Sequence, residues 1–300
     1  MSLRKVNDME SMKEQIKTIY RTNNRIINAS IFHFFCILIG AMMIYPVLWM
    51  IFASFKTQSE IFSQSLKLFP EKWLFLNYAE GWKGFGNYSF TRFFINSAIV
   101  SVISTVGTIF SAAFIGFGFA RNKFKGRGFF FGTMIGTMML PYQIIMIPQY
   151  ILFHKMGWIN TYLPIIVPWI LGYPFFIFLL TQFMRSIPPD LDEAAKIDGC
   201  NKFSIFFRIY FPLSKPALIT VAIFSFYWKW NDFIQPLIYL TKPTLYTVSV
   251  ALKLFADPTS VTNWGAMLAI ATLSILPIVV IFLILQSYIT EGISTTGIKG

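Results

Sequence analysis

Six long apolar segments constrain this chain more than any other feature of its sequence. They run approximately over residues 31–55, 93–120, 129–153, 162–184, 217–240 and 265–289. Each is long enough to cross a hydrocarbon core of about 30 Å, and a helix satisfies its own backbone amides there without water. Only 13% of the residues are charged, and the mean hydropathy is +0.60. The sequence therefore predicts an all-α polytopic membrane protein with six transmembrane helices.

Basic residues are distributed unevenly between these segments. The N-terminus, the second and fourth loops and the C-terminus hold 15 Lys and Arg, against 8 in the other three loops. The positive-inside rule then places both termini in the cytoplasm. This distribution also accounts for the net charge of +12 without nucleic acid, because no basic groove interleaved with aromatic residues is present.

Three regions follow from this pattern: a cytoplasmic amphipathic segment at 1–30, a six-helix membrane domain at 31–289 and a cytoplasmic tail at 290–300. In the first, Lys13, Lys17, Arg21 and Arg25 form a basic stripe at helical spacing beside a separate apolar one. Such a helix lies on the anionic inner leaflet or docks on a partner protein, and the sequence leaves both open.

The loop at 186–212 is polar but strongly patterned. Pro188 and Pro189 end the preceding helix, and Asp190 is expected to cap a short new helix with Glu193 as its capping-box partner. Gly199 is suited to leave that helix in the left-handed conformation. The face expected to accept another surface carries Leu191, Ala194, Ala195 and Asp198, of which the two alanines permit close approach.

This loop resembles the signature of inner-membrane permeases of ATP-binding-cassette (ABC) importers, which is EAA, three residues, G, nine residues, I, one residue, LP. Here Glu193-Ala194-Ala195 is followed by Gly199, Ile209 and Pro212, with Phe211 in the leucine position. The resemblance implies a MetI-like core in which the motif is a cytoplasmic coupling helix, seated in a cleft of a separate ATPase subunit. The alternative is a capped connection between two membrane helices, which the full spacing disfavours.

Further stretches are similar to the maltose-type, carbohydrate-uptake branch of these permeases. They are 188–193, 230–237 and the C-terminal 295–300, and the similarity covers nearly the whole chain. It implies a bacterial inner membrane location, a second permease subunit, an ATPase dimer, an extracellular or periplasmic solute-binding protein and a sugar substrate. Lys299 and Gly300 are then candidate contacts with the ATPase.

Polar groups within the apolar segments are candidates for the solute path. They are Gln143 beside Pro141, and Trp230, Asn231, Asp232 and Gln235 in the fifth segment. Hydrogen-bonding groups beside a flat aromatic face suit sugars. The alternative is packing between helices, with Lys229 and Asp232 paired at i,i+3.

The sequence offers no site for catalysis or metal binding. It has no G-x-x-x-x-G-K-[ST] phosphate loop, so ATP and Mg²⁺ are expected on the partner ATPase and no cofactor on this chain. Gly116 and Gly118 lie within a span and are interpreted as helix-packing residues. The competing hypotheses are an ABC permease for a peptide, polyamine or other polar solute, and a stand-alone channel or membrane-embedded enzyme.

Overall fold

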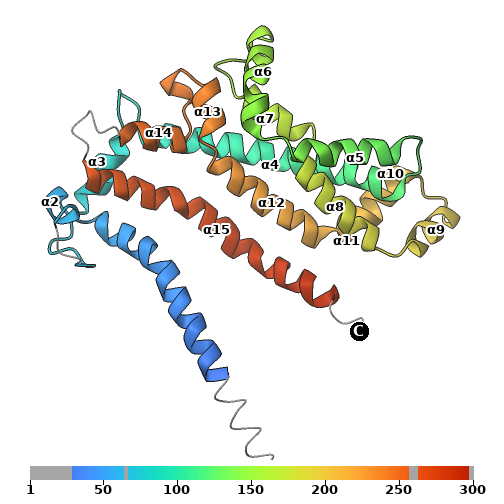
Figure 1. Cartoon of the computed structure of the whole chain (residues 1–300), viewed down its shortest axis with the longest axis horizontal. Helices are drawn as coiled ribbons and strands as arrows, with labels where there is room; N and C mark the ends of the chain where they lie inside the picture. Colours follow the sequence, from blue (N-terminus) through green and yellow to red (C-terminus); the bar gives the residue numbers. More distant parts are fainter. Residues whose placement is uncertain (1–28, 64–66, 257–262, 297–300) are drawn as a thin grey trace, which may run out of the picture.

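The computed structural model describes residues 29–63, 67–256 and 263–296, which fold into helices with no β-strand (Figure 1). An N-terminal helix spans Ala29–Ala53. The helices that follow are α2 (Gln58–Ile61), α3 (Leu76–Lys83), α4 (Phe90–Arg121), α5 (Arg127–Met138), α6 (Tyr142–Lys155), α7 (Leu163–Ile170), α8 (Pro174–Ser186), α9 (Asp190–Ile197), α10 (Lys202–Ile205), η1 (Phe206–Tyr210), α11 (Phe211–Leu213), α12 (Lys215–Trp230), α13 (Ile234–Tyr239), η2 (Pro243–Leu245), α14 (Val248–Phe255) and α15 (Trp264–Thr296).

The 32-residue helix α4 lies at the centre and packs against α7, α8 and α12. Small residues permit these close approaches. A Cβ on Gly116 would lie 3.2 Å from both Leu180 Cβ and the Thr181 backbone nitrogen of α8. Gly118 has open space at the same position, so only the first of the two predicted packing glycines makes a close contact.

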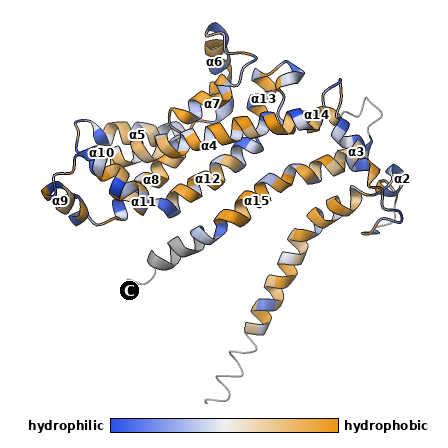
Figure 2. Cartoon of the chain, turned by 180° about the vertical axis from the view of Figure 1, so that it is seen from behind, coloured by the Kyte–Doolittle hydropathy of each residue, from blue (hydrophilic) through white to orange (hydrophobic). Residues whose placement is uncertain are grey.

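Among the described helices that are long enough to cross a membrane, the N-terminal helix and α15 are the most apolar and the least covered. In Figure 2 both are largely orange and diverge from each other below the α4 bundle. None of the most apolar 18-residue window of Ala29–Ala53 is buried, and 11% of that of α15 is. Such surfaces require lipid or another membrane subunit around them.

The third predicted span is not one straight helix. α5 and α6 meet at an angle of 101°, and Pro141 lies between them. Proline lacks an N–H group and its ring disfavours helical backbone in the residue before it, so α5 ends near Met139. Figure 1 shows α6 standing away from the bundle.

The fourth and fifth predicted spans are also interrupted. Gly172, with φ at +131°, and Pro174 separate α7 from α8. α12 ends at Trp230, so the residues that follow lie in a break before α13 rather than within a spanning helix. Within the described residues, four helical stretches are long and apolar enough to cross a membrane, or up to six if each sharply bent helix pair counts as one span.

Some predicted features lie at or beyond the edges of the described chain. Residues 1–28 of the amphipathic segment, together with Lys299 and Gly300, are outside the described residues. At the other end α15 continues to Thr296, so the start of the predicted tail is helical.

Candidate functional site

The short helix α9 carries the motif and stands at one end of the molecule (Figure 1). Its predicted cap is wrong. Pro189 is the N-cap residue, Asp190 is already helical, and no side chain caps the helix. Three acidic residues instead occupy the first turn (Asp190, Asp192 and Glu193), where negative charge favours the helix dipole.

The C-terminal end of α9 is a Schellman motif. The Cys200 N–H donates to the Ala195 carbonyl at 2.9 Å, and the Gly199 N–H donates to the Lys196 carbonyl at 3.0 Å. Gly199 has φ at +76°, which confirms the predicted left-handed exit. A glycine takes this conformation without the steric cost that a Cβ would add.

The predicted contact face of α9 is divided. Ala195 is buried within the main core cluster, whereas Leu191, Ala194 and Asp198 are exposed. Sequence reasoning missed Ile197, which is 87% exposed and lies three residues after Ala194. An apolar residue on a polar surface segment was the available signal. The outer surface of α9 therefore presents Leu191, Glu193, Ala194, Ile197 and Asp198.

After α9 the chain returns to the bundle through a helix with a local defect. η1 is π-helical and holds Ile209, and Pro212 follows it in α11. Pro212 cannot donate to a carbonyl in the preceding turn, which accounts for the wider turn before it. The run from Lys202 to Leu213 then meets α12 at 74°. The motif thus connects α9 directly to a long membrane helix.

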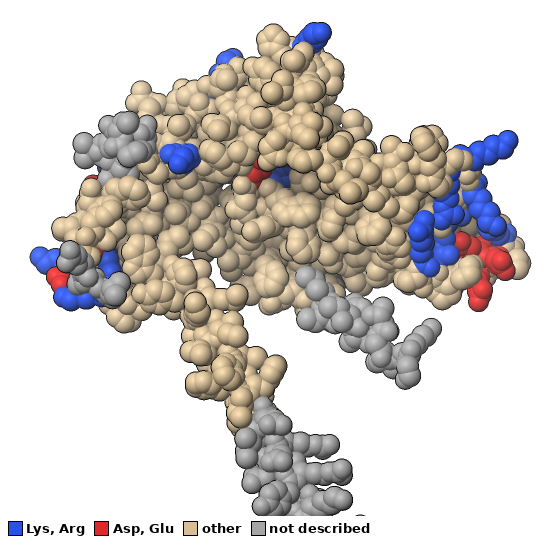
Figure 3. Space-filling model, in the orientation of Figure 1, with Lys and Arg blue, Asp and Glu red and all other residues tan. Residues whose placement is uncertain are grey.

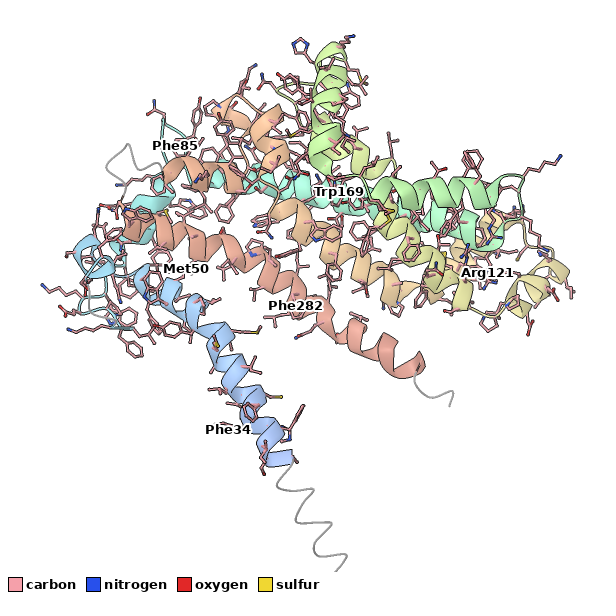
Figure 4. The ribbon with its side chains drawn as sticks, viewed as in Figure 1. Phe34, Met50, Phe85, Arg121, Trp169 and Phe282 are labelled. Carbon is pink, nitrogen blue, oxygen red and sulfur yellow. The ribbon has the colours of Figure 1, made fainter. Side chains whose placement is uncertain are left out.

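Arg121, the last residue of α4, holds both ends of this segment. Its guanidinium donates a hydrogen bond to the carbonyl of Ile187, where α8 ends. The same group lies over the ring of the fully buried Tyr210, 4.8 Å from its centroid. Figure 4 shows Arg121 at the α9 end of the molecule. α4 is therefore fixed to the chain before and after α9.

A cavity of about 610 Å³ lies at the junction of α5, α6, α7, α8 and α12, and the start of α13 also contributes to its lining. Its polar lining includes Asp232, Gln235, Tyr142 and Gln149, and its aromatic lining includes Trp169, Tyr173, Phe175 and Trp228. Figure 3 shows acidic and basic atoms together in a hollow at the otherwise uncharged middle of the molecule, and Trp169 is labelled in that region in Figure 4.

A buried cation supports the polar side of this cavity. The Lys229 ammonium group donates to Asp232 Oδ2 at 3.2 Å and to Gln235 Oε1 at 2.8 Å. It also lies 4.3 Å from the centroid of the Trp169 ring. The ion pair that the sequence suggested at i,i+3 is present, and Lys229 is only 2% exposed.

Only some of the residues predicted to line the solute path lie in the lining of this cavity. Asp232 and Gln235 line it, whereas Trp230 is buried and donates from Nε1 to the Ser274 carbonyl of α15 at 2.9 Å. Asn231 bonds back to the Tyr227 carbonyl, and Gln143 is exposed outside the cavity lining. Two other residues of α6, Tyr142 and Gln149, line the cavity instead, because a different face of α6 is turned toward it.

Comparison with known proteins places these features in one family. Residues 112–295 match the family described as "Binding-protein-dependent transport system inner membrane component". The chain is 37% identical to the "Probable ABC transporter permease protein YurM" of Bacillus subtilis, over 85% of this chain and 84% of that protein. It is 32% identical to the "Arabinooligosaccharides transport system permease protein AraQ" of the same species, over 89% and 94%.

The fold is shared with a solved importer. A chain from the "Crystal structure of a bacterial ABC transporter involved in the import of the acidic polysaccharide alginate" matches with a TM-score of 0.75 at 22% identity, over 88% of this chain and 95% of that one. Together with the family match, this agrees with a multi-pass inner membrane protein that is a permease and not a catalytic subunit. The chain belongs to the inner membrane components of binding-protein-dependent transport systems, the permeases of ABC importers.

Proposed function

We propose that this chain forms half of the path by which an ABC importer brings a sugar or oligosaccharide into a bacterial cell. Support for a saccharide comes from relatives whose names specify arabinooligosaccharides, galactooligosaccharides and diacetylchitobiose. ATP and Mg²⁺ bind to separate ATPase subunits, and a solute-binding protein delivers the cargo. A second, similar permease completes the path as a heterodimer, and the uncovered apolar faces of Ala29–Ala53 and α15 favour such pairing.

The single observation that carries the mechanism is the attachment of α9. This helix projects an exposed surface of Leu191, Glu193, Ala194, Ile197 and Asp198, yet Arg121 and buried Ala195 fix it to the bundle. A rigid helix held in this way transmits a push at its outer surface to α4 and α12. Closure of the ATPase subunits then rocks the membrane helices between inward-open and outward-open states.

Each motif residue has a role in this lever. Glu193, Ala194, Asp198 and Leu191 contact the ATPase, and Gly199 ends the helix. Ile209 and Pro212 shape the return to α12. Lys299 and Gly300 make a second ATPase contact, and both termini lie in the cytoplasm.

A crosslinking experiment tests the lever in the assembled importer. Ala194→Cys and Ile197→Cys are expected to form disulfide or bismaleimide products with a cysteine introduced into the ATPase, because both positions are exposed. Ala195→Cys is the matched control, since Ala195 is 6% exposed and faces the core. Absence of any ATPase product at 194 and 197, under all nucleotide conditions, would contradict the mechanism.

Uptake into proteoliposomes tests the function itself. The complete importer with its binding protein should accumulate arabinotriose, galactotriose or diacetylchitobiose only when ATP is supplied to the ATPase side. Glu193→Ala is expected to abolish uptake, because it removes the proposed contact with the ATPase. The complex should stay in the membrane, because the exposed carboxylate makes no internal contact in the described structure. Transport of only peptides or polyamines, or uptake by the chain alone, would refute the proposal.

A further inference from the structure

We propose that the cavity at the α5–α8 and α12 junction binds one ring of a neutral saccharide and discriminates against anionic ones. This inference rests on the proposed function and deepens it by naming the class of cargo. Its basis is the pairing of flat aromatic walls with a carboxylate whose charge is already compensated. The volume of about 610 Å³ is within the range of small-molecule sites.

Aromatic side chains form one wall of the cavity. Trp169 stacks on Tyr173 with ring centroids 4.3 Å apart, and Tyr173 lies 5.9 Å from Trp228. Trp169 is buried beneath the Lys229 ammonium group, whereas Tyr173 and Trp228 are half-buried and line the open space. The C–H face of a sugar ring packs on such flat surfaces, which combine apolar area with well-defined geometry.

Polar groups in the same lining suit hydroxyl groups. Asp232 supplies carboxylate acceptors, and Gln235, whose Oε1 accepts from Lys229, retains the N–H donors of its amide. The Tyr142 hydroxyl, also in the lining, is buried and makes no hydrogen bond of normal geometry within the described part of the chain. Hydroxyl groups both donate and accept, so a sugar ring can pair with Asp232 and Gln235.

The charges around the cavity decide which sugars are favoured. Asp232 is the one charged residue among the described residues of the lining, and the Lys229 ammonium group is already engaged with Asp232, Gln235 and the Trp169 ring. The pair is neutral overall, and its acidic member faces the space. A uronate or sulfonate would bring a negative charge that no described cation in the lining balances, which is costly away from water.

The binding experiment uses the complete importer in nanodiscs without its solute-binding protein, so that the membrane subunits alone select the ligand. Saturation-transfer NMR titrations compare arabinotriose, galactotriose and diacetylchitobiose with trigalacturonate. At least one neutral sugar should bind more tightly than trigalacturonate. Trp228→Ala should weaken that binding by about tenfold, while Trp228→Phe retains most of it. Tyr227→Ala, an exposed neighbour on α12 outside the lining, should leave it unchanged.

Variants that change the charge of the cavity distinguish an effect on sugar preference from a general loss of structure. Asp232→Asn leaves the Lys229 charge uncompensated and should shift the preference toward trigalacturonate. Adding Lys229→Met restores neutrality and should restore the neutral preference. The inference is overturned if no neutral sugar outcompetes trigalacturonate, or if Trp228→Ala and Tyr227→Ala behave alike. ATP-dependent uptake by the wild type alongside either result would leave the transport function intact, so the two failures are distinguishable.

Discussion

Arg121 makes two contacts that are far apart in sequence, with the Ile187 carbonyl and the Tyr210 ring. Replacing it with Ala removes a charge-assisted hydrogen bond and a cation–π contact, worth about 2 kcal/mol together. Arg121→Ala is therefore expected to lower the number of solute molecules moved per ATP hydrolysed, because α9 can move without α4. Arg121→Lys retains a cation over Tyr210 and should restore part of the coupling.

Parallel assays of ATP hydrolysis and uptake in proteoliposomes measure this ratio. A purely structural role would lower both rates equally through loss of folded complex. An unchanged ratio in Arg121→Ala would therefore contradict a positioning role for this residue.

Gly116 and Gly118 provide a matched pair for helix packing in α4. A Cβ at Gly116 would meet the α8 backbone at 3.2 Å, and one at Gly118 would meet nothing within 4 Å. Gly116→Val is expected to destabilise the protein by about 1–3 kcal/mol, and Gly118→Val by much less. Thermal unfolding in detergent measures both, and equal losses would contradict the close approach of α4 and α8.

The sequence predicts that both glycines pack against another helix, but it cannot tell which of the two makes the close contact. Gly116 and Gly118 are two residues apart in one apolar run, and only the rotation of α4 against α8 distinguishes them. The sequence also cannot tell that Trp230 packs between helices while Asp232 lines the cavity, since this depends on where α12 ends. Local features such as the left-handed Gly199 were predictable, because they depend on nearby chain alone.

At the scale of elements, the exit of α9 is a direct test of the lever. Gly199→Ala places a Cβ in the left-handed region at a cost of about 1–2 kcal/mol, although no atom lies within 4 Å to clash with it. The substitution should reorient the end of α9 and reduce transport. Gly199→Asn tolerates positive φ better and should retain more activity. Uptake assays compare the two variants. Equal losses of transport would contradict the idea that the left-handed backbone at residue 199 is what matters.

Helix breaks show where element prediction fails. The sequence predicts one continuous span over 129–153, because the hydropathy is uninterrupted there although Pro141 lies within it. The 101° bend is accompanied by a contact with a distant segment, since Phe153 of α6 packs on Tyr239 of α13. Such contacts between separated segments have no signature in one sequence. Apolar length therefore predicted which segments enter the membrane better than it predicted their paths.

At the scale of the whole molecule, charged residues are concentrated at the two ends of the long axis. Figure 3 shows basic and acidic side chains gathered at the end that holds α9 and α10 and at the opposite end near α2. Between them the face seen in Figure 3 is mostly uncharged, with scattered basic groups, and a membrane-spanning zone requires few charges. The cluster Arg121, Lys123, Lys125 and Arg127 lies at the α9 end, which is the end expected to face the cytoplasm.

Cysteine accessibility tests this orientation. Lys125 lies in the basic loop between α4 and α5 and Gln58 in α2, and both are exposed at opposite ends of the molecule. With Cys36 and Cys200 replaced by Ser, a membrane-impermeant maleimide should label Gln58→Cys in intact cells, after removal of any outer barrier. Lys125→Cys should react only once the inner membrane is permeabilised, because basic loops stay on the cytoplasmic side. The reverse pattern would place α9 outside the cell, where no ATP-driven partner could reach it, and would remove the lever from the mechanism.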